Sequence, residues 1–216
     1  RRYYDDMAGV FCDMAATRIG RMACGVEAAA DIRLSYRWSL SFAASAGRYK
    51  FIRNPRITVI SDVDNSVVDA RAVSHLRGCT PGGAPQLTAC AELGYFGPKG
   101  WGFKTSAGYA GARYVEPSLL RRTERIARQG GTTREMFDAF TLDAALFKTF
   151  WFDRLRLTAS LILRNLLGDG DIVYSAYEAQ RVRRIRSGDT LCYAPHAARL
   201  TYAYPRSFYL TVSYRF

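Results

Sequence analysis

The chain has 216 residues, 49% of them hydrophobic and 13% aromatic, and its formal net charge is +12 at pH 7. This composition excludes a disordered chain, and the length suffices for one domain with a sizeable core, so we expect residues 1–216 to form a single unit. No run of eighteen uncharged apolar residues occurs, which excludes a transmembrane helix. The chain opens on Arg1-Arg2-Tyr3-Tyr4, so we expect a secreted parent protein to carry its signal peptide further upstream.

The positive charge raises the question of nucleic-acid binding. Basic residues occur at the ends of predicted strands and in polar segments such as 121–128 and 181–186, not in one patch, and none of the common nucleic-acid motifs is present. We therefore predict no nucleic-acid partner. A basic surface that faces anionic lipopolysaccharide accounts for the charge equally well.

The five cysteines do not predict a metal site, because no CxxC spacing occurs among Cys12, Cys24, Cys79, Cys90 and Cys192. Their odd number prevents complete pairing within the chain. A bridge between Cys79 and Cys192 stays open but is the less favoured state. Cys24 and Cys90 fall inside strand patterns, where we expect small buried thiols.

No constellation of catalytic residues is found. The two histidines, His75 and His196, are far apart in sequence, and Asp169 and Asp171 lack the further oxygen ligands and the distal Glu of a calcium loop. We expect these residues to be solvated loop positions and predict no enzyme activity, no metal and no cofactor.

Apolar and polar residues alternate with a period of two through long stretches of the chain, which predicts strands. In residues 24–34, for example, Val26 and Ile32 share one face while Glu27 and Asp31 share the other. Seven complete strands are predicted, over residues 24–34, 37–46, 86–95, 101–109, 140–146, 154–164 and 207–216, and residues 1–4 are interpreted as the tail of an eighth. Strands of about ten residues exceed the usual five or six of a soluble sheet and match the length needed to cross a bilayer at a tilt.

Short and long connections take turns along the chain. Short turns are expected near residues 35–36, 97–100 and 150–153, and long links without predicted structure span 51–85, 115–136 and 167–205. This alternation is typical of outer-membrane barrels, which have short periplasmic turns and long extracellular loops. The sequence thus predicts an all-β fold, an antiparallel transmembrane β-barrel. Inward positions rich in Ser, Ala and Gly suit a wide lumen, so the eight strands are expected to form an arc of a larger barrel.

The three tryptophans, Trp38, Trp101 and Trp151, each lie beside one of the short turns. This predicts that all three lie at one membrane boundary, where an amphipathic indole ring is stable. Tyr214 and Phe216 are expected to reach the same girdle from the final strand.

Several segments resemble the TonB-dependent receptors. Residues 205–216 resemble their closing strand and the assembly signal of outer-membrane proteins, whose alternate positions here are Phe208, Leu210, Val212, Tyr214 and Phe216. Residues 164–169 are similar to the junction before the last extracellular loop, 25–27 to the start of an inbound strand, and 114–123 to a loop of receptors of the Bacteroidetes type. The chain departs from the usual junction at Gly168-Asp169-Gly170-Asp171, where Lys is common, and contains more cysteine than such barrels usually have.

The resemblance covers essentially the whole chain and implies the C-terminal part of a 22-stranded barrel, with the N-terminal strands, the plug domain and the TonB box outside it. It implies import of an iron chelate, cobalamin, glycan or peptide across the outer membrane of a Gram-negative cell, energised by the TonB complex through the plug. The further partners implied are outer-membrane lipid, lipopolysaccharide, the barrel-assembly machinery and a surface lipoprotein.

Aromatic and arginine residues of the long links are the candidate substrate-binding residues. Tyr rings stack on sugars or chelate rings, and Arg forks hold carboxylates or phosphates. The candidates are Tyr114, Arg121, Arg122, Tyr174, Tyr177, Arg181 and Tyr193. The alternative interpretation is that each of them only packs loops together or contacts lipopolysaccharide.

Two other functions stay open at this point. A passive porin or an outer-membrane barrel enzyme would share the barrel, although an enzyme would require an acid-base or nucleophilic set at the rim that the sequence lacks. A soluble β-rich binding module would instead bury its apolar faces against each other.

Overall fold

The computed structural model describes residues 1–216 except 7, 125–134, 137, 154, 169–171 and 189; the side chains of 135, 184, 187 and 190–193 also lie outside the description. The described part is all-β and its sheets are antiparallel, which confirms the predicted fold class. Its helices are the two short 3-10 turns η1 (Pro98–Gly100) and η2 (Leu120–Arg122), and neither could span a membrane.

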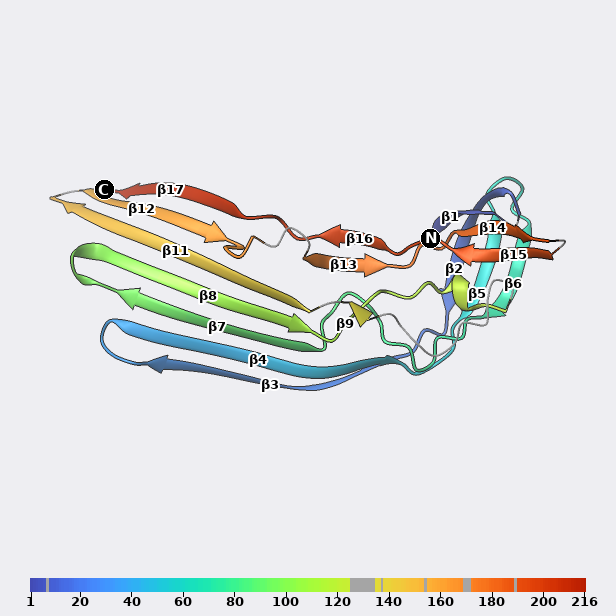
Figure 1. Cartoon of the computed structure of the whole chain (residues 1–216), viewed down its shortest axis with the longest axis horizontal. Helices are drawn as coiled ribbons and strands as arrows, with labels where there is room; N and C mark the ends of the chain where they lie inside the picture. The colour runs from blue at the N-terminus through green and yellow to red at the C-terminus, as the bar shows by residue number, and fades with distance from the viewer. Residues whose placement is uncertain (7, 125–134, 137, 154, 169–171, 189) are drawn as a thin grey trace.

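A seven-stranded sheet forms one end of the molecule (Figure 1). The strands follow the order β17-β12-β11-β8-β7-β4-β3. Each strand pairs with the strand of this sheet that precedes or follows it in the chain, and β17 and β3 are the two edges. They are β3 (Arg21–Arg33), β4 (Trp38–Phe51), β7 (Leu87–Phe96), β8 (Trp101–Gly111), β11 (Ala139–Phe152), β12 (Leu155–Arg164) and β17 (Ser207–Arg215). All seven predicted complete strands are present in this sheet, and β3, β4, β8 and β11 run further than their patterns indicated.

The pairing register separates the sheet into an apolar and a polar face. Leu161 of β12 lies between Leu146 of β11 and Leu210 of β17, whereas its neighbour Ser160 lies opposite Thr211. Directly opposed residues point to the same side of a sheet, so the alternation in each strand becomes one continuous apolar surface across seven strands.

The apolar face has no protein layer over it in the described part of the chain. The buried hydrophobic residues belong to the other end of the molecule, and β17 exposes 75% of Phe208, 71% of Leu210 and 66% of Tyr214. A soluble sheet of this length would bury such a face in a core. Within the described residues, the large sheet therefore differs from the sheets of a soluble β-rich module, whose apolar faces are buried against each other.

The polar face contains small and charged side chains that bond across strands. Ser45 and Thr88 are hydrogen-bonded at 2.7 Å, and Lys104 donates to Glu92 at 2.7 Å. Both contacts join residues on the side opposite the apolar face, as their register shows. This face therefore suits contact with water.

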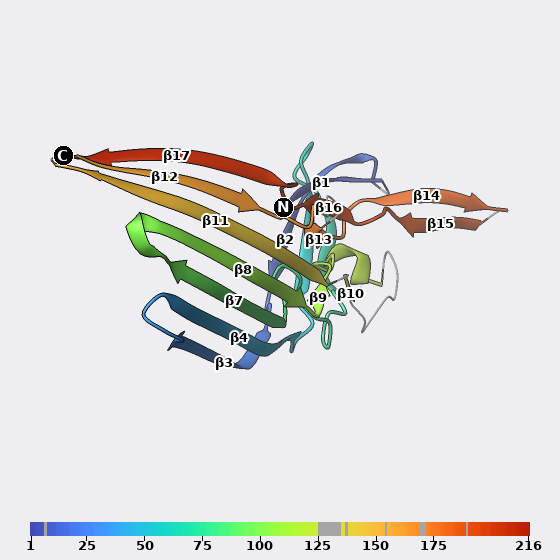
Figure 2. The ribbon, with the colours of Figure 1, turned by 60° about the vertical axis from the view of Figure 1, so that its left-hand side comes forward.

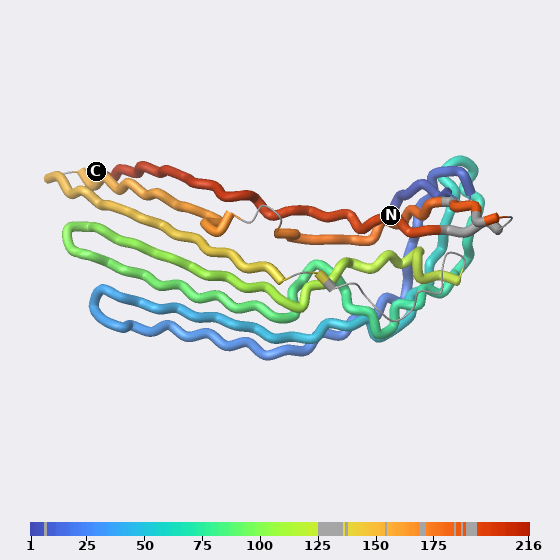
Figure 3. The backbone as a smooth tube through the Cα atoms, in the orientation of Figure 1, coloured from blue at the N-terminus to red at the C-terminus, as the bar shows by residue number. Residues whose placement is uncertain are grey.

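The outer connections continue the ladder of the large sheet rather than leaving it as unstructured loops. β2 (Val10–Thr17) runs into β3, and β4 runs into β5 (Arg56–Ser61), so that two neighbouring strands become one long bent hairpin (Figure 3). β1 (Arg2–Asp5) and β6 (Val67–Val73) complete a separate four-stranded sheet in the order β1-β2-β5-β6. Residues 1–4, predicted as the tail of an eighth strand, overlap β1, which pairs with β2 in this second sheet and not within the seven-stranded one. Because β2 runs into the edge strand β3, the eighth strand of the arc stays a prediction.

The remaining links are hairpins as well. β9 (Arg113–Tyr114) pairs with β10 (Glu135–Met136), β13 (Val173–Tyr177) with β16 (Arg199–Tyr202), and β14 (Val182–Ser187) with β15 (Thr190–Pro195). The last pair extends away from the rest of the molecule (Figure 2). The expectation of long links without regular structure is corrected accordingly.

The hydrophobic core lies at this outer end. One cluster joins Tyr3, Cys12, Met14, Ile57 and Val59 of the second sheet to Leu120 of η2. A second, smaller cluster consists of Phe51, Leu76 and Cys79, and Leu119 packs against both. The outer end is thus a packed body, whereas the large sheet is a single layer.

The structure also differs from the expectation for two of the cysteines. Cys24 and Cys90 are exposed free thiols, because the single-layer sheet leaves both of its faces uncovered, so the expectation that they are buried is wrong. Cys79 is a buried free thiol, and the side chain of Cys192 lies outside the description.

Candidate functional site

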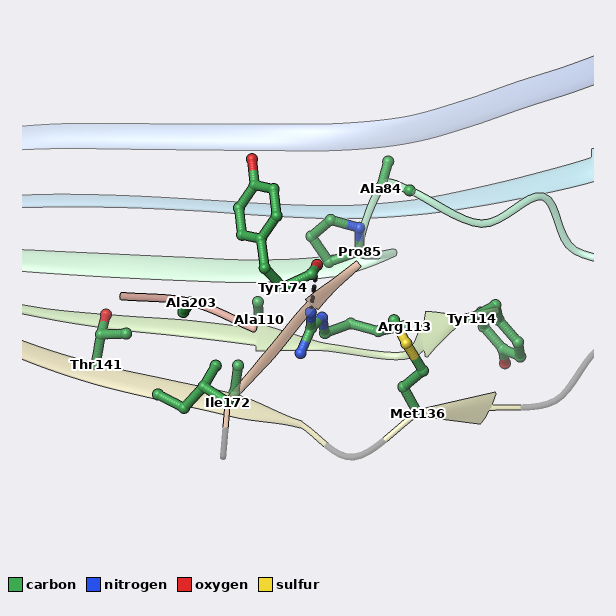
Figure 4. Close-up of a pocket in the computed structure, with 12 residues that line it drawn as sticks. Ala84, Pro85, Ala110, Arg113, Tyr114, Met136, Thr141, Ile172, Tyr174 and Ala203 are labelled. Atoms are coloured by element: carbon green, nitrogen blue, oxygen red, sulfur yellow. Dashed lines mark hydrogen bonds between the residues drawn. The ribbon is translucent and has the colours of Figure 1, made fainter. Parts of the chain in front are cut away.

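A cavity of about 260 Å³ lies where the outer ends of the large sheet meet the connections above it (Figure 4). Its wall includes Thr141 of β11, Tyr114 of β9, Met136 of β10 and Tyr174 of β13. Ala84 and Pro85, from the connection between β6 and β7, also line it, so three outer connections contribute to one partly open space.

Arg113 joins two of the segments that line this cavity. Its guanidinium is buried and donates hydrogen bonds to the carbonyl oxygens of Val173 and Tyr174, the latter at 2.7 Å. Burial lowers the pKa of Arg113, which nearby Asp138 partly offsets. The ring of Tyr174 points away from the guanidinium (Figure 4), so the backbone is held while the ring stays 72% exposed.

A buried ion pair lies beside η2. Arg122 donates through Nη1 to Glu178 Oε2 at 2.5 Å and through Nη2 to Glu178 Oε1 at 3.1 Å. The Arg122 side chain is 4% exposed and that of Glu178 is 19% exposed. The backbone amide of Ser118 donates to the same carboxylate at 2.7 Å, and its hydroxyl oxygen lies 2.7 Å from Oε1 of Gln180. These contacts join residues 118–122 to residues 178–180.

Arg122 and Glu178 each shift the pKa of the other in the direction that stabilises both charged forms. Burial alone raises the pKa of Glu178, but the hydrogen bonds from Arg122 and Ser118 and the charge of Arg122 outweigh it and leave the pKa below its ordinary value of 4.5. For Arg122, burial lowers the pKa, and the hydrogen bond and charge of Glu178 outweigh it and raise the pKa. Both groups are therefore charged at neutral pH.

Arg121 is buried as well, and its Nη2 donates to the carbonyl oxygen of Arg181 at 3.2 Å. Both Arg121 and Arg122 were candidates for substrate contact. Their burial leaves no surface for a ligand, and their bonds are to neighbouring segments of the chain. The structure thus favours the packing interpretation for these two residues.

An open groove of about 820 Å³ lies between β1 and residues 177–181. Two of the candidates, Tyr177 and Arg181, line it. Arg181 forms a two-pronged ion pair with Asp6, with Nε–Oδ2 and Nη2–Oδ1 distances of 2.9 Å, and lies 5.1 Å from the ring centre of Tyr4. The hydrogen bonds and charge of Asp6 raise the pKa of Arg181. This groove therefore combines basic and aromatic side chains at the outer end.

The seven candidates therefore divide among four places. Tyr114 and Tyr174 line the cavity, Tyr177 and Arg181 line the groove, Arg121 and Arg122 are buried, and the side chain of Tyr193 lies outside the described residues. Sequence reasoning missed Arg113 and Arg199. The register of β13 with β16 reveals the latter, since it sets Arg199 opposite Tyr177.

The short turns and the tryptophans lie at the other end of the sheet (Figure 1). Trp101 pairs with Lys148, which lies on the same face of β11 as Phe150, so Trp101 belongs to the apolar face. Trp38 pairs with Tyr95 on that same face. Trp151 lies opposite Arg156, on the polar face. The three indoles thus share one end but not one face, and the membrane role of the girdle stays a prediction.

Metal binding finds no support in the described residues, where no group of three or more His, Cys, Asp and Glu side chains could hold an ion. His75 lies 4.0 Å from the carboxylate of Glu124.

No family model matches the chain, and no curated protein matches it. Among solved structures it is similar to the siderophore receptor PiuA from Acinetobacter baumannii, with a TM-score of 0.53 and 14% sequence identity. The similarity covers 95% of this chain and 25% of that receptor, so the chain spans about a quarter of the receptor's length. The chain therefore has a fold that also occurs within a siderophore receptor, and the likeness extends to the fold alone.

Proposed function

We propose that the chain forms part of the barrel wall and the outer loops of an outer-membrane receptor that imports a substrate. The observation that carries the proposal is the single-layer sheet with one continuous, uncovered apolar face. In a bilayer this face would meet acyl chains, the polar face would meet a wet lumen, and closure of the sheet by further strands would pair the backbone groups at the edges β3 and β17. The fold likeness to a siderophore receptor supports the same proposal.

The finer proposal is TonB-energised transport in a Gram-negative cell, without covalent catalysis. It draws on the resemblance of residues 205–216 and 164–169 to TonB-dependent receptors. In this proposal a plug elsewhere in the full protein couples to the TonB complex, and the barrel-assembly machinery recognises the last strand. Lipopolysaccharide and a surface lipoprotein would contact the outer end.

Expression of the full protein in a Gram-negative host tests the proposal. A folded barrel is expected in the outer-membrane fraction and should migrate differently in detergent gels before and after boiling. Energised import predicts accumulation of a labelled substrate that a protonophore abolishes. Recovery of the protein as a soluble, non-heat-modifiable species would contradict the barrel, and protonophore-insensitive flux of small solutes would point to a passive porin.

A further inference from the structure

The open groove between β1 and residues 177–181 carries an excess of positive charge. Four arginines line it, together with three tyrosines: Arg1, Arg2, Tyr3, Tyr4, Tyr177, Arg181 and Arg199. Glu178 is the one acidic lining residue, and it is engaged by the buried Arg122.

Two of the four guanidinium groups are already neutralised, and two are not. Arg2 is paired with Asp62 and Arg181 with Asp6. Arg1 and Arg199 are exposed, and within the described part of the chain neither guanidinium forms an ion pair. Net positive charge therefore concentrates in the groove.

Aromatic residues form part of the groove wall. Tyr177 lies directly opposite Arg199 in the β13–β16 register, so the two side chains share one side of that hairpin. Tyr4 is fixed by donating its hydroxyl to the carbonyl oxygen of Gly9 at 3.0 Å. A ligand that enters would meet guanidinium forks beside the rings of Tyr4 and Tyr177.

This combination selects a chemical class of ligand. A guanidinium binds planar or tetrahedral oxyanions through two parallel hydrogen bonds, and several guanidinium groups around one groove favour a ligand with more than one such anion. A groove of about 820 Å³ falls in the usual range for small-molecule sites. A neutral ligand would leave the charge of Arg1 and Arg199 uncompensated.

A soluble ligand fits the location better than a lipid headgroup. The groove lies at the outer end, near the N-terminus, whereas the apolar face belongs to the large sheet at the opposite end (Figure 1). Resting on the proposed receptor function, we propose that this groove is a capture site for a soluble polyanionic ligand with carboxylate or phosphate groups, with Arg199 as a direct contact.

Calorimetric titration of the full protein in neutral detergent with tricarballylate and with inorganic phosphate tests this inference. Tricarballylate is expected to bind, phosphate to compete with it, and the neutral triamide of the same skeleton to show no binding. Arg199→Gln should weaken tricarballylate binding about tenfold or more, because it removes one charge-assisted pair. Arg183→Gln removes another exposed charge, from the protruding hairpin, and should leave the affinity unchanged. Unchanged heat-modifiability checks that each variant folds.

Equal affinity of the native protein and Arg199→Gln, or equal binding of the triamide, would overturn the inference. Binding to phosphatidylglycerol vesicles without binding of either soluble anion would also overturn it and assign the charge to the membrane surface. Anion binding is measured without transport, so a groove that binds in a protein that fails to import contradicts the receptor proposal alone. Import that survives loss of anion binding contradicts the groove alone.

Discussion

At the scale of single residues, the arginines of the outer end fall into two groups, buried and groove-lining. Arg113, Arg121 and Arg122 are buried and bond to distant parts of the chain, whereas Arg181 and Arg199 face the groove. The sequence could indicate that arginines cluster after Tyr114, but not which of them are buried. The partner of Arg122 is Glu178, 56 residues away, and only the packing of two outer connections brings them together.

Breaking the Arg122–Glu178 pair is expected to loosen the contact between residues 118–122 and 178–180. Arg122→Met leaves the Glu178 carboxylate partly buried without its main partner, at a cost of about 3 kcal/mol. Hydrogen exchange of the Ser118 and Thr123 amides should accelerate accordingly. In the double variant Arg122→Met/Glu178→Leu the protection of the Thr123 amide, which donates to Leu120, should largely return, whereas the Ser118 amide should stay unprotected because its acceptor on Glu178 is gone. Equal protection in Arg122→Met and the native protein would mean that the pair contributes nothing.

The same pair predicts a response to acid. The pKa of Glu178 is lower in the folded protein than its ordinary value of 4.5, so the stabilisation is fully present above about pH 4.5 and is lost as the pH falls through the folded pKa. Protection of the Ser118 amide, corrected for the intrinsic exchange rate, should therefore fall in that acidic window. Glu178→Gln should remove this pH dependence. A fall in protection at the same pH in Glu178→Gln would assign the transition to another group.

At the scale of elements, the strands of the large sheet could be predicted because their period of two holds over long stretches. Each residue of β12, for example, alternates strictly from Leu155 to Ser160 between the two faces. The short outer strands escaped prediction for a physical reason. These strands pack against one another and against η2. Which of their residues become buried therefore depends on contacts between segments far apart in the chain, and no local pattern records those contacts.

A charge placed on either face of β12 tests the assignment of the faces. Leu161→Arg would put a guanidinium in hydrocarbon near mid-strand, at a cost of about 2–4 kcal/mol, whereas Ser160→Arg would put it in the lumen at little cost. The urea midpoint of the folded protein in micelles should fall for Leu161→Arg and stay near the native value for Ser160→Arg. The reverse order would exchange the two faces.

At the scale of the whole molecule, the chain combines a single-layer sheet with a packed outer end. The alternation of short and long links correctly indicated that the long connections lie together at one end of the large sheet. In an antiparallel sheet, every second connection lies at the same end. What could not be predicted is that three outer connections line one cavity and that the last of them borders a groove with β1, since these spaces exist only between segments far apart in the chain.

The uncovered apolar face is the feature on which the proposed function depends, and lipid contact can be measured at its tryptophans. The full protein would be reconstituted in bilayers with brominated acyl chains, and the quenching of each indole obtained by difference from Trp38→Phe, Trp101→Phe and Trp151→Phe variants. Trp38 and Trp101, on the apolar face, are expected to be strongly quenched, and Trp151, on the polar face, much less. Absence of quenching at both Trp38 and Trp101 would show that this face meets protein or water and would contradict the account.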